Sequence, residues 1–387
     1  MAENVTKYDM LKTNDEEKQT GFDAGEKDIR LSTDRSFTTQ SSDLSSNSGF
    51  EETEEDIVFY NCDRYGFLKD VDANREGKQV EDTVISKRRD TEENRTKKWI
   101  KMLGKWNEYR ENKPKKVKRR IRKGVPDCLR GLVWNLLSGI GNLKANNSEL
   151  YEELCARDDS PSDSIYDTIE ADIHRTFPNH EMFKEKMSEG QMSLRRILHS
   201  YSRYDPEVGY CQGMGFITAT FLMYMPEEEA FWQLVSVMQQ PPTKIRELYL
   251  PGLPFTQKAL FVYDGVIRIH LNKLYQHFTS QSIATSMFAQ NWIMCFFTYN
   301  YNYDMVTRIW DIFLAEGWKI VYRTGLALLK EAEPDLLRKD FENCLHFFRS
   351  LPSRIDGHQL IENSFKIPLK TAQIKELEQE YDDQQLG

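Results

Sequence analysis

Two short segments combine residue types that could do chemistry, and the first holds one carboxylate and one guanidinium. It reads I-E-A-D-I-H-R-T-F-P over residues 169–178. Asp172 and Arg175 are three residues apart, so on a helix their side chains can form an ion pair. A cation near a helix C-terminus is also ordinary helix chemistry. Spacing alone therefore leaves both a structural and a functional role open for Arg175.

The second segment is an irregular loop that ends in a side-chain amide. Residues 204–216 read Y-D-P-E-V-G-Y-C-Q-G-M-G-F, and Pro206 with two close glycines predicts a tight loop before an apolar helix. Gln212 beside Gly213 places an amide at a loop-to-helix junction, where another molecule can approach the backbone closely. A Gln that only hydrogen-bonds the start of the helix is the competing interpretation, and this segment leaves both open.

Motifs for self-contained catalysis are missing from the sequence. It contains neither GxxxxGK[ST] nor GxGxxG, and HExxH and GxSxG are also missing. The seven histidines are scattered, and the six cysteines lie far apart without a CxxC pair. We therefore expect no cofactor, no metal site and no disulfide frame. Hydrolysis of ATP or GTP by this chain alone is not expected either.

Taken together and in this order, the two segments resemble the TBC family, the GTPase-activating proteins for Rab GTPases. The likeness extends upstream to G-V-P at 124–126 and L-R-G-x-x-W at 129–134. Downstream it includes residues 288–330, with I-W-D-x-F-x-x-E-G around Trp310. It covers roughly residues 118–350. The D-R-Y-G-F segment and the W-I-K-M-L helix further upstream resemble the RN-tre-type branch of the family.

The resemblance implies a fold, an activity and a partner. The fold would be an all-α TBC domain built of two helical subdomains. The chain would not be an enzyme in its own right but would stimulate GTP hydrolysis by a Rab-family GTPase. Arg175 would be an arginine finger supplied in trans, aimed by Asp172, and Gln212 would position the attacking water in place of the GTPase's own Gln. The GTP-bound Rab would carry its own GTP and Mg²⁺, which agrees with the missing phosphate loop.

The resemblance also implies which neighbours assist the two fingers, as we call Arg175 and Gln212. The expected supporting residues are Asp172, Arg130, Trp134 and Tyr210, and the expected partner contacts are Pro206 and Gly213. Arg130 and Trp134 would buttress the site or touch the partner rather than take part in the reaction. Gly215 stands where the family more often has Ser or Asn, a departure that could loosen the Gln loop.

A non-catalytic TBC scaffold is the alternative function. Such a protein would bind a small GTPase or another trafficking partner without raising hydrolysis. The presence of both Arg175 and Gln212 favours the activator, because a scaffold has no reason to keep both. The sequence does not identify the Rab, the membrane or the oligomeric state.

Helical periodicity dominates the region that must position these residues. Leu129, Val133, Leu136 and Leu137 form one apolar face of a helix that Gly139 can end. Ile165, Ile169 and Ile173 recur every four residues before Pro178. Further helices are expected over residues 91–113, 113–124, 192–204, 226–238, 303–317 and 324–337. Without a run of alternating strands, these helices predict an all-α fold.

Four regions are expected along the chain. Residues 1–55 form an acidic, Ser/Thr-rich tail with too few apolar groups to fold, and we expect it to be disordered. Residues 56–117 form an N-terminal extension with an amphipathic helix, preceded by a charged linker over 70–90. Residues 118–350 form the TBC domain. Residues 351–387 form a C-terminal extension with a short polar helix.

Charge and targeting signals limit where the protein acts. The net charge of −9 belongs almost entirely to the tail, whose own balance is −8, so a nucleic-acid partner is not expected. The basic run at 113–123 suits a charged helix, although a nuclear signal or an anionic-membrane patch is the alternative. Neither a signal peptide nor a membrane span is expected. These features predict a cytoplasmic protein that is recruited to endomembranes through its partner.

Overall fold

The computed structural model describes residues 62–68, 81–157 and 164–386, and every regular element in those ranges is a helix. The all-α expectation is therefore confirmed. Two isolated β-bridges accompany the helices and join Cys62 to Leu68 and Phe67 to His180. The acidic tail expected over residues 1–55 lies outside the described residues.

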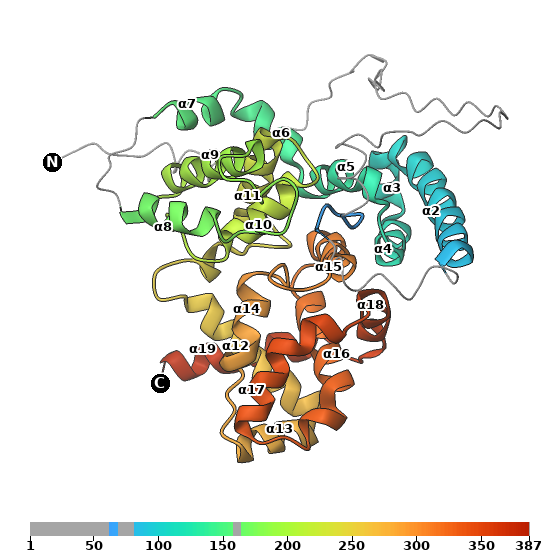
Figure 1. Ribbon diagram of the computed structural model, residues 1–387, viewed down its shortest axis with the longest axis vertical. Coiled ribbons are helices and arrows are strands. Elements are labelled where there is room, and N and C mark those ends of the chain that lie inside the picture. Colours follow the sequence, from blue (N-terminus) through green and yellow to red (C-terminus); the bar gives the residue numbers. More distant parts are fainter. Residues whose placement is uncertain (1–61, 69–80, 158–163, 387) are drawn as a thin grey trace, which may run out of the picture. The chain divides into compact units, whose positions relative to one another are not determined.

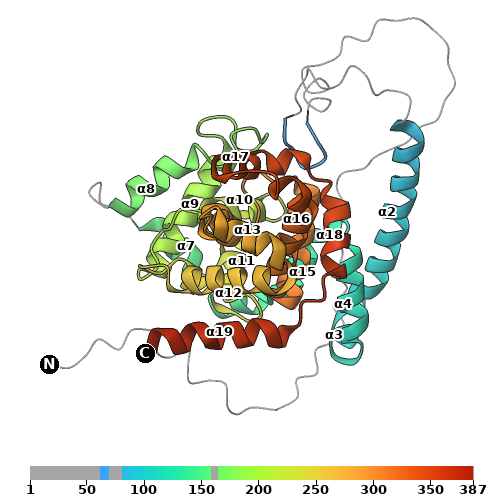
Figure 2. The ribbon, with the colours of Figure 1, turned by 90° about the horizontal axis from the view of Figure 1, so that it is seen from below.

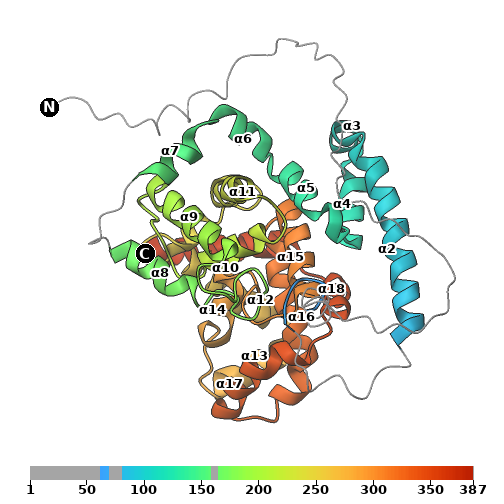
Figure 3. The ribbon, with the colours of Figure 1, turned by 45° about the horizontal axis from the view of Figure 1, so that its top comes forward.

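The helices fall into two groups that meet at α15 (Tyr303–Glu316). Figures 1 and 3 show α5 to α11 gathered in one group and α12 to α17 in the other. The first group and the helices before it are α2 (Glu81–Leu103), α3 (Trp106–Asn112), α4 (Pro114–Lys123), α5 (Asp127–Ser138), α6 (Ile140–Asn146), α7 (Leu150–Ala156), α8 (Ser164–Ile173), α9 (Glu189–Tyr204), α10 (Met214–Leu222) and α11 (Glu227–Gln239). The remaining elements are η3 (Arg246–Leu248), α12 (Pro254–His270), α13 (Asn272–Ser280), α14 (Ser286–Met294), α16 (Lys319–Leu336), α17 (Phe341–Ser350), η4 (Leu351–Arg354), α18 (Gly357–Lys366) and α19 (Thr371–Leu386).

Helix α10 lies at the centre of the first group and is apolar on all sides. All nine of its residues are buried, which is the pattern of a core helix rather than of an amphipathic surface helix. It packs against α8, α9 and α11. Its Phe221 meets Trp310 of α15 edge to face at 5.1 Å, so aromatic packing joins the two groups. The helix that follows the Gln212 loop is therefore part of the core.

Several sequence signals act as predicted. Gly139 follows α5 in the left-handed conformation, and Gly317 follows α15 with φ of 73°. The basic run forms α4, the charged helix that we expected, and this helix buries Val117 and Ile121. Pro226 precedes α11, whose first turn carries three glutamates that suit the positive end of the helix dipole.

The segment 91–113 does not form the single helix that we expected. It is divided into α2 and α3 at Gly104, and the break allows Trp99, Met102 and Trp106 all to reach the core. Helix α2 also begins at Glu81, inside the stretch that we expected to be a linker. Helix α8 ends at Ile173 rather than at Pro178, so Arg175 lies in the turn that follows the helix.

The described residues on either side of the main domain pack against it. Phe67 packs against the rings of Phe177, His180 and Tyr303, so the D-R-Y-G-F segment docks on the domain. Helix α19 runs alongside α12 (Figure 2) and buries Ile374 and Leu377. With 16 residues, α19 is longer than the short polar helix that we expected in the C-terminal extension, and one of its faces is apolar. Among the described helices, none combines the length and apolarity needed to cross a bilayer.

Candidate functional site

Arg175 lies in a tight turn that the end of α8 defines. Its backbone N–H donates to the carbonyl of Asp172 at 3.1 Å, and the Thr176 hydroxyl donates to the same carbonyl at 2.9 Å. Phe177 follows with φ of 48° and buries its ring. The Arg175 side chain is 51% exposed and forms an ion pair with the carboxylate of Asp172. The turn is therefore anchored in the core while the guanidinium faces outward.

The Asp172 carboxylate is the fixed point of this arrangement. It is buried, with one oxygen paired to Arg175 and the other accepting from the Tyr210 hydroxyl at 2.6 Å. Burial and the bond to Asp172 both raise the pKa of Tyr210, so its hydroxyl keeps its proton and can donate it. The same hydroxyl lies against Gly215, in the first turn of α10, where a Cβ would be 3.2 Å from it. Tyr210 thus connects the Arg175 turn to the start of α10.

The loop between α9 and α10 presents Gln212. It begins at Asp205, which is buried and accepts two bonds from Arg246 at 2.6 and 2.8 Å. Its turn requires Gly209, which has φ of 57° and whose absent Cβ would lie 2.8 Å from Cδ1 of Ile165 in α8. Gln212 itself is exposed. The loop is therefore fixed on both sides, and its amide is the part that solvent or a partner can reach.

Gly213 and Gly215 explain how closely the two segments approach. Gly213 has φ of 109°, and a Cβ there would lie 3.2 Å from the Cys295 sulfur. A Cβ on Gly215 would lie 3.1 Å from the Thr176 hydroxyl and 3.2 Å from the Tyr210 hydroxyl. Gly215 therefore packs between the residue after Arg175 and the support of Asp172. A larger side chain at this position would press on both hydroxyls, so the glycine allows the two segments to lie close together.

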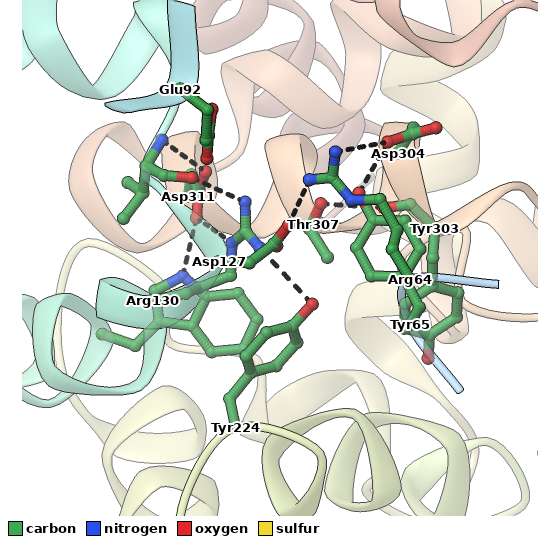
Figure 4. Close-up of polar contacts among 12 residues, drawn as sticks. Arg64, Tyr65, Glu92, Asp127, Arg130, Tyr224, Tyr303, Asp304, Thr307 and Asp311 are labelled. Atoms are coloured by element: carbon green, nitrogen blue, oxygen red, sulfur yellow. Dashed lines mark hydrogen bonds and ion pairs between the residues drawn. The ribbon is translucent and has the colours of Figure 1, made fainter. Parts of the chain in front are cut away.

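Arg130 and Trp134 lie in a separate buried network (Figure 4). Nε of Arg130 donates to Asp311 at 3.1 Å, and the indole N–H of Trp134 donates to the same carboxylate oxygen at 2.9 Å. Arg130 is only 2% exposed and also donates to the carbonyl of Val125 at 2.8 Å and to Tyr224 at 3.4 Å. Burial opposes the charge of Arg130, but the Asp311 carboxylate outweighs it and raises the arginine pKa. These polar atoms join α5 to α15 rather than pointing to Arg175.

Other residues of this region were not anticipated from the sequence. Arg64 pairs with Asp127, and the Tyr65 hydroxyl donates to Asp304 at 2.6 Å, so the N-terminal segment joins the same network. Tyr299, between α14 and α15, is 42% exposed and packs edge to face on Phe216 of α10 at 5.2 Å. The sequence feature that could have indicated it is the run F-T-Y-N-Y-N-Y at residues 297–303. This run has poor helix propensity and therefore favours a loop.

Comparison with known proteins identifies the domain that holds these residues. The model of the Rab-GTPase-TBC domain matches residues 127–337. The human "Ecotropic viral integration site 5 protein homolog" is 38% identical over 286 residues, 73% of this chain and 34% of the relative. The "Rab GTPase-activating protein tbc-11" of Caenorhabditis elegans is 36% identical over 290 residues, 73% of this chain and 30% of the relative. The chain thus spans about a third of the length of these relatives.

Solved structures agree. The TBC domain of a flagellar RabGAP from Chlamydomonas superposes with a TM-score of 0.61 at 27% identity, covering 79% of this chain and 98% of that one. The Ypt/Rab-GAP domain of Gyp1p gives a TM-score of 0.56 at 21% identity, covering 69% of this chain and 97% of that one, and supports the fold. Since the family model matches more than half of its residues, the chain belongs to the Rab-GTPase-TBC domain family.

Proposed function

We propose that this protein stimulates GTP hydrolysis by a Rab-family GTPase, with Arg175 and Gln212 supplied in trans. One observation carries the proposal: Arg175 and Gln212 are both exposed, and they lie on two segments that the hydrogen bond from the half-buried Tyr210 to Asp172 joins. A side chain that only stabilised its own helix would not need this support. The family membership and the Rab GTPase-activating relative support the same activity.

The chemistry suits these two groups. As GTP is hydrolysed, negative charge develops on the transferred phosphoryl group and the attacking water must be held in line. Arg175 would neutralise that charge, which is worth about 10³–10⁵ in rate, or about 4–7 kcal/mol of barrier. Gln212 would orient the water with its amide. The partner GTPase would bring GTP and Mg²⁺, so this chain would need no nucleotide site of its own.

Neighbouring residues receive matching roles. Asp172 would hold the guanidinium in its productive direction, and Tyr210 would hold Asp172. Pro206 is exposed near the start of this loop and would contact the partner. Gly213 is buried at the end of the loop and would allow its backbone conformation. Arg130 and Trp134 would support the domain from its core. By acting on membrane-bound Rabs, the protein would regulate vesicle trafficking from the cytoplasmic side.

Single-turnover phosphate release from a panel of GTP-loaded Rabs tests the proposal. We expect at least one Rab to be stimulated and Arg175→Ala to lower the maximal stimulated rate by roughly 10³-fold or more. Arg175→Lys should be almost as defective, because an ammonium cannot supply the planar fork of donors. Gln212→Ala should cause a large loss of its own.

Arg349→Ala is the matched control, because Arg349 is also exposed but lies on α17. Its rate should equal that of the wild type. If both finger variants stimulate hydrolysis like the wild type while remaining folded, the catalytic role is refuted. A Rab that binds without being stimulated would then indicate the scaffold.

A further inference from the structure

A basic cavity of about 690 Å³ lies between α2, α4, α15 and α18. Eight of its sixteen lining residues are Lys or Arg, and Glu362 is the only acidic one among them. Figures 1, 2 and 3 all show α2 and α4 on the opposite side of the domain from α8. The cavity is thus separate from the segment that carries Arg175, and the proposed GTPase activation does not use it.

Only part of the positive charge is neutralised by the protein. Arg122 forms a two-pronged pair with Glu316 at 2.6 and 2.5 Å, and Arg95 pairs with Glu92 at 2.9 Å. In contrast, three exposed cations form no ion pair within the described part of the chain: Lys98 of α2 and Arg119 and Lys123 of α4. We call these three cations the rim, and they give the cavity positive charge that no described carboxylate neutralises.

Arg308 adds a buried cation to the cavity. It is 8% exposed, and Nη2 donates to the carbonyl of Arg122 at 2.5 Å, but its buried Nε has no partner in the described structure. A Cβ on Gly124 would lie 3.3 Å from Nη1 of Arg95 and 3.4 Å from Cζ of Arg308, so the two guanidinium groups flank the same glycine. Burial lowers the pKa of Arg308, and Arg95 and Arg130 lower it further, although the Asp311 and Glu362 carboxylates act in the opposite direction. Buried charges in proteins are normally paired, but Arg308 forms no ion pair with any described residue.

We propose that this cavity binds an anion that carries several phosphate groups close together. Guanidinium groups and lysine ammonium groups are the side chains that recognise phosphate, Arg by paired N–H donors and Lys as a point charge. The volume lies within the 300–1,000 Å³ typical of small-ligand pockets. One phosphate would meet the unpartnered donor of Arg308, and others would meet the rim.

Two sources could supply this chemistry, a soluble inositol polyphosphate or the headgroup of a phosphorylated inositol lipid. An extended acidic peptide fits less well, because the cations are gathered around one cavity that includes the buried Arg308 rather than spread along a groove. A bound headgroup would fix one side of the domain at a membrane while the opposite side carried Arg175. Binding can be measured without any GTPase, so the proposal can fail while the GTPase-activating function stands.

The test uses the full chain with two probes. Calorimetric titration measures binding of inositol hexakisphosphate, and co-sedimentation measures binding to vesicles containing phosphatidylinositol bisphosphate, against phosphatidylserine vesicles of equal charge. The variant K98A/R119A/K123A removes the rim, whose side chains hold no ion pair, so the fold should survive. The matched control is K273A/R338A, two exposed cations elsewhere on the domain.

We expect the wild type to bind at least one probe, the rim variant to bind roughly tenfold more weakly or worse, and the control to bind like the wild type. Arg308→Gln should weaken binding as well. Binding of inositol hexakisphosphate alone would assign a soluble ligand, and stronger binding of the lipid vesicles than of the equally charged controls would assign a headgroup. The proposal is overturned if neither probe binds, or if the rim variant binds as tightly as the wild type.

Discussion

Replacing Tyr210 by phenylalanine removes one oxygen atom from the point where the Arg175 turn meets the start of α10. The ring stays, but the Asp172 carboxylate loses a donor at 2.6 Å. A hydrogen bond to a charged group contributes about 1.5–3 kcal/mol. If most of that energy holds the guanidinium in its productive direction, the stimulated rate falls roughly 10- to 100-fold, since about 1.4 kcal/mol corresponds to tenfold.

Single-turnover GTP hydrolysis at saturating activator measures this loss in the chemical step, separately from Rab binding. Tyr224→Phe is the matched control, because its hydroxyl also bonds a buried charged side chain, accepting from Arg130 at 3.4 Å, but does not contact Asp172. The control should keep the wild-type rate within about twofold. Both variants should unfold cooperatively, with Tyr210→Phe less stable by about 1.5–3 kcal/mol at most.

The variant Y210F/R175A shows whether Tyr210 acts through the arginine. Once Arg175 is removed, its orientation no longer matters, so the second change should cost much less than it does in the wild type. A Tyr210→Phe protein with the full stimulated rate would refute the supporting role. So would a double variant whose losses simply multiply.

Three further predictions concern the partner, the core and pH. Replacing the switch-region Gln of the partner Rab should leave much of the stimulated rate, and complete loss in phosphate-release assays would contradict the role of Gln212. Arg130→Ala should lower the free energy of unfolding by about 3–5 kcal/mol, because the Asp311 carboxylate stays buried without its cationic partner. A denaturation midpoint equal to that of the wild type would show that the pair of Arg130 and Asp311 does not stabilise the fold. Burial lowers the pKa of His180 in the folded protein below its value of about 6.5 in the unfolded chain. The neutral imidazole therefore contributes fully to the free energy of unfolding above about pH 6.5, and this contribution is lost as the pH falls from there towards the folded-state pKa. Urea unfolding at several pH values should show this loss of stability in acid for the wild type and a smaller loss for His180→Gln. An equal dependence of the free energy of unfolding on pH in the two proteins would contradict the prediction.

Regular features of the site could be predicted from the sequence, since they depend on local spacing. The isoleucines of α8 recur every four residues, and the glycines of the Gln loop indicate a turn by their positions alone. The pair of Asp172 with Arg175 also follows from their separation of three residues. Resemblance to the TBC family supplied the roles of Arg175 and Gln212, which spacing alone left open.

Other features depend on contacts between distant residues. Tyr210 lies 38 residues after Asp172, and no periodicity indicates that their side chains meet. The end of α8 at Ile173 was missed because the turn uses a non-glycine residue, Phe177, at positive φ, which tertiary packing holds there. The break between α2 and α3 likewise depends on which side chains the core can accommodate.

The complete burial of α10 has a consequence for how the protein can be regulated. Amide hydrogens in such a helix exchange with solvent only when a large part of the domain opens, because no smaller unit can release it. Gln212 lies only two residues before this helix. Local melting of the loop is therefore a poor means of switching the activity off. Control is more readily exerted by covering the surface or by relocating the whole molecule.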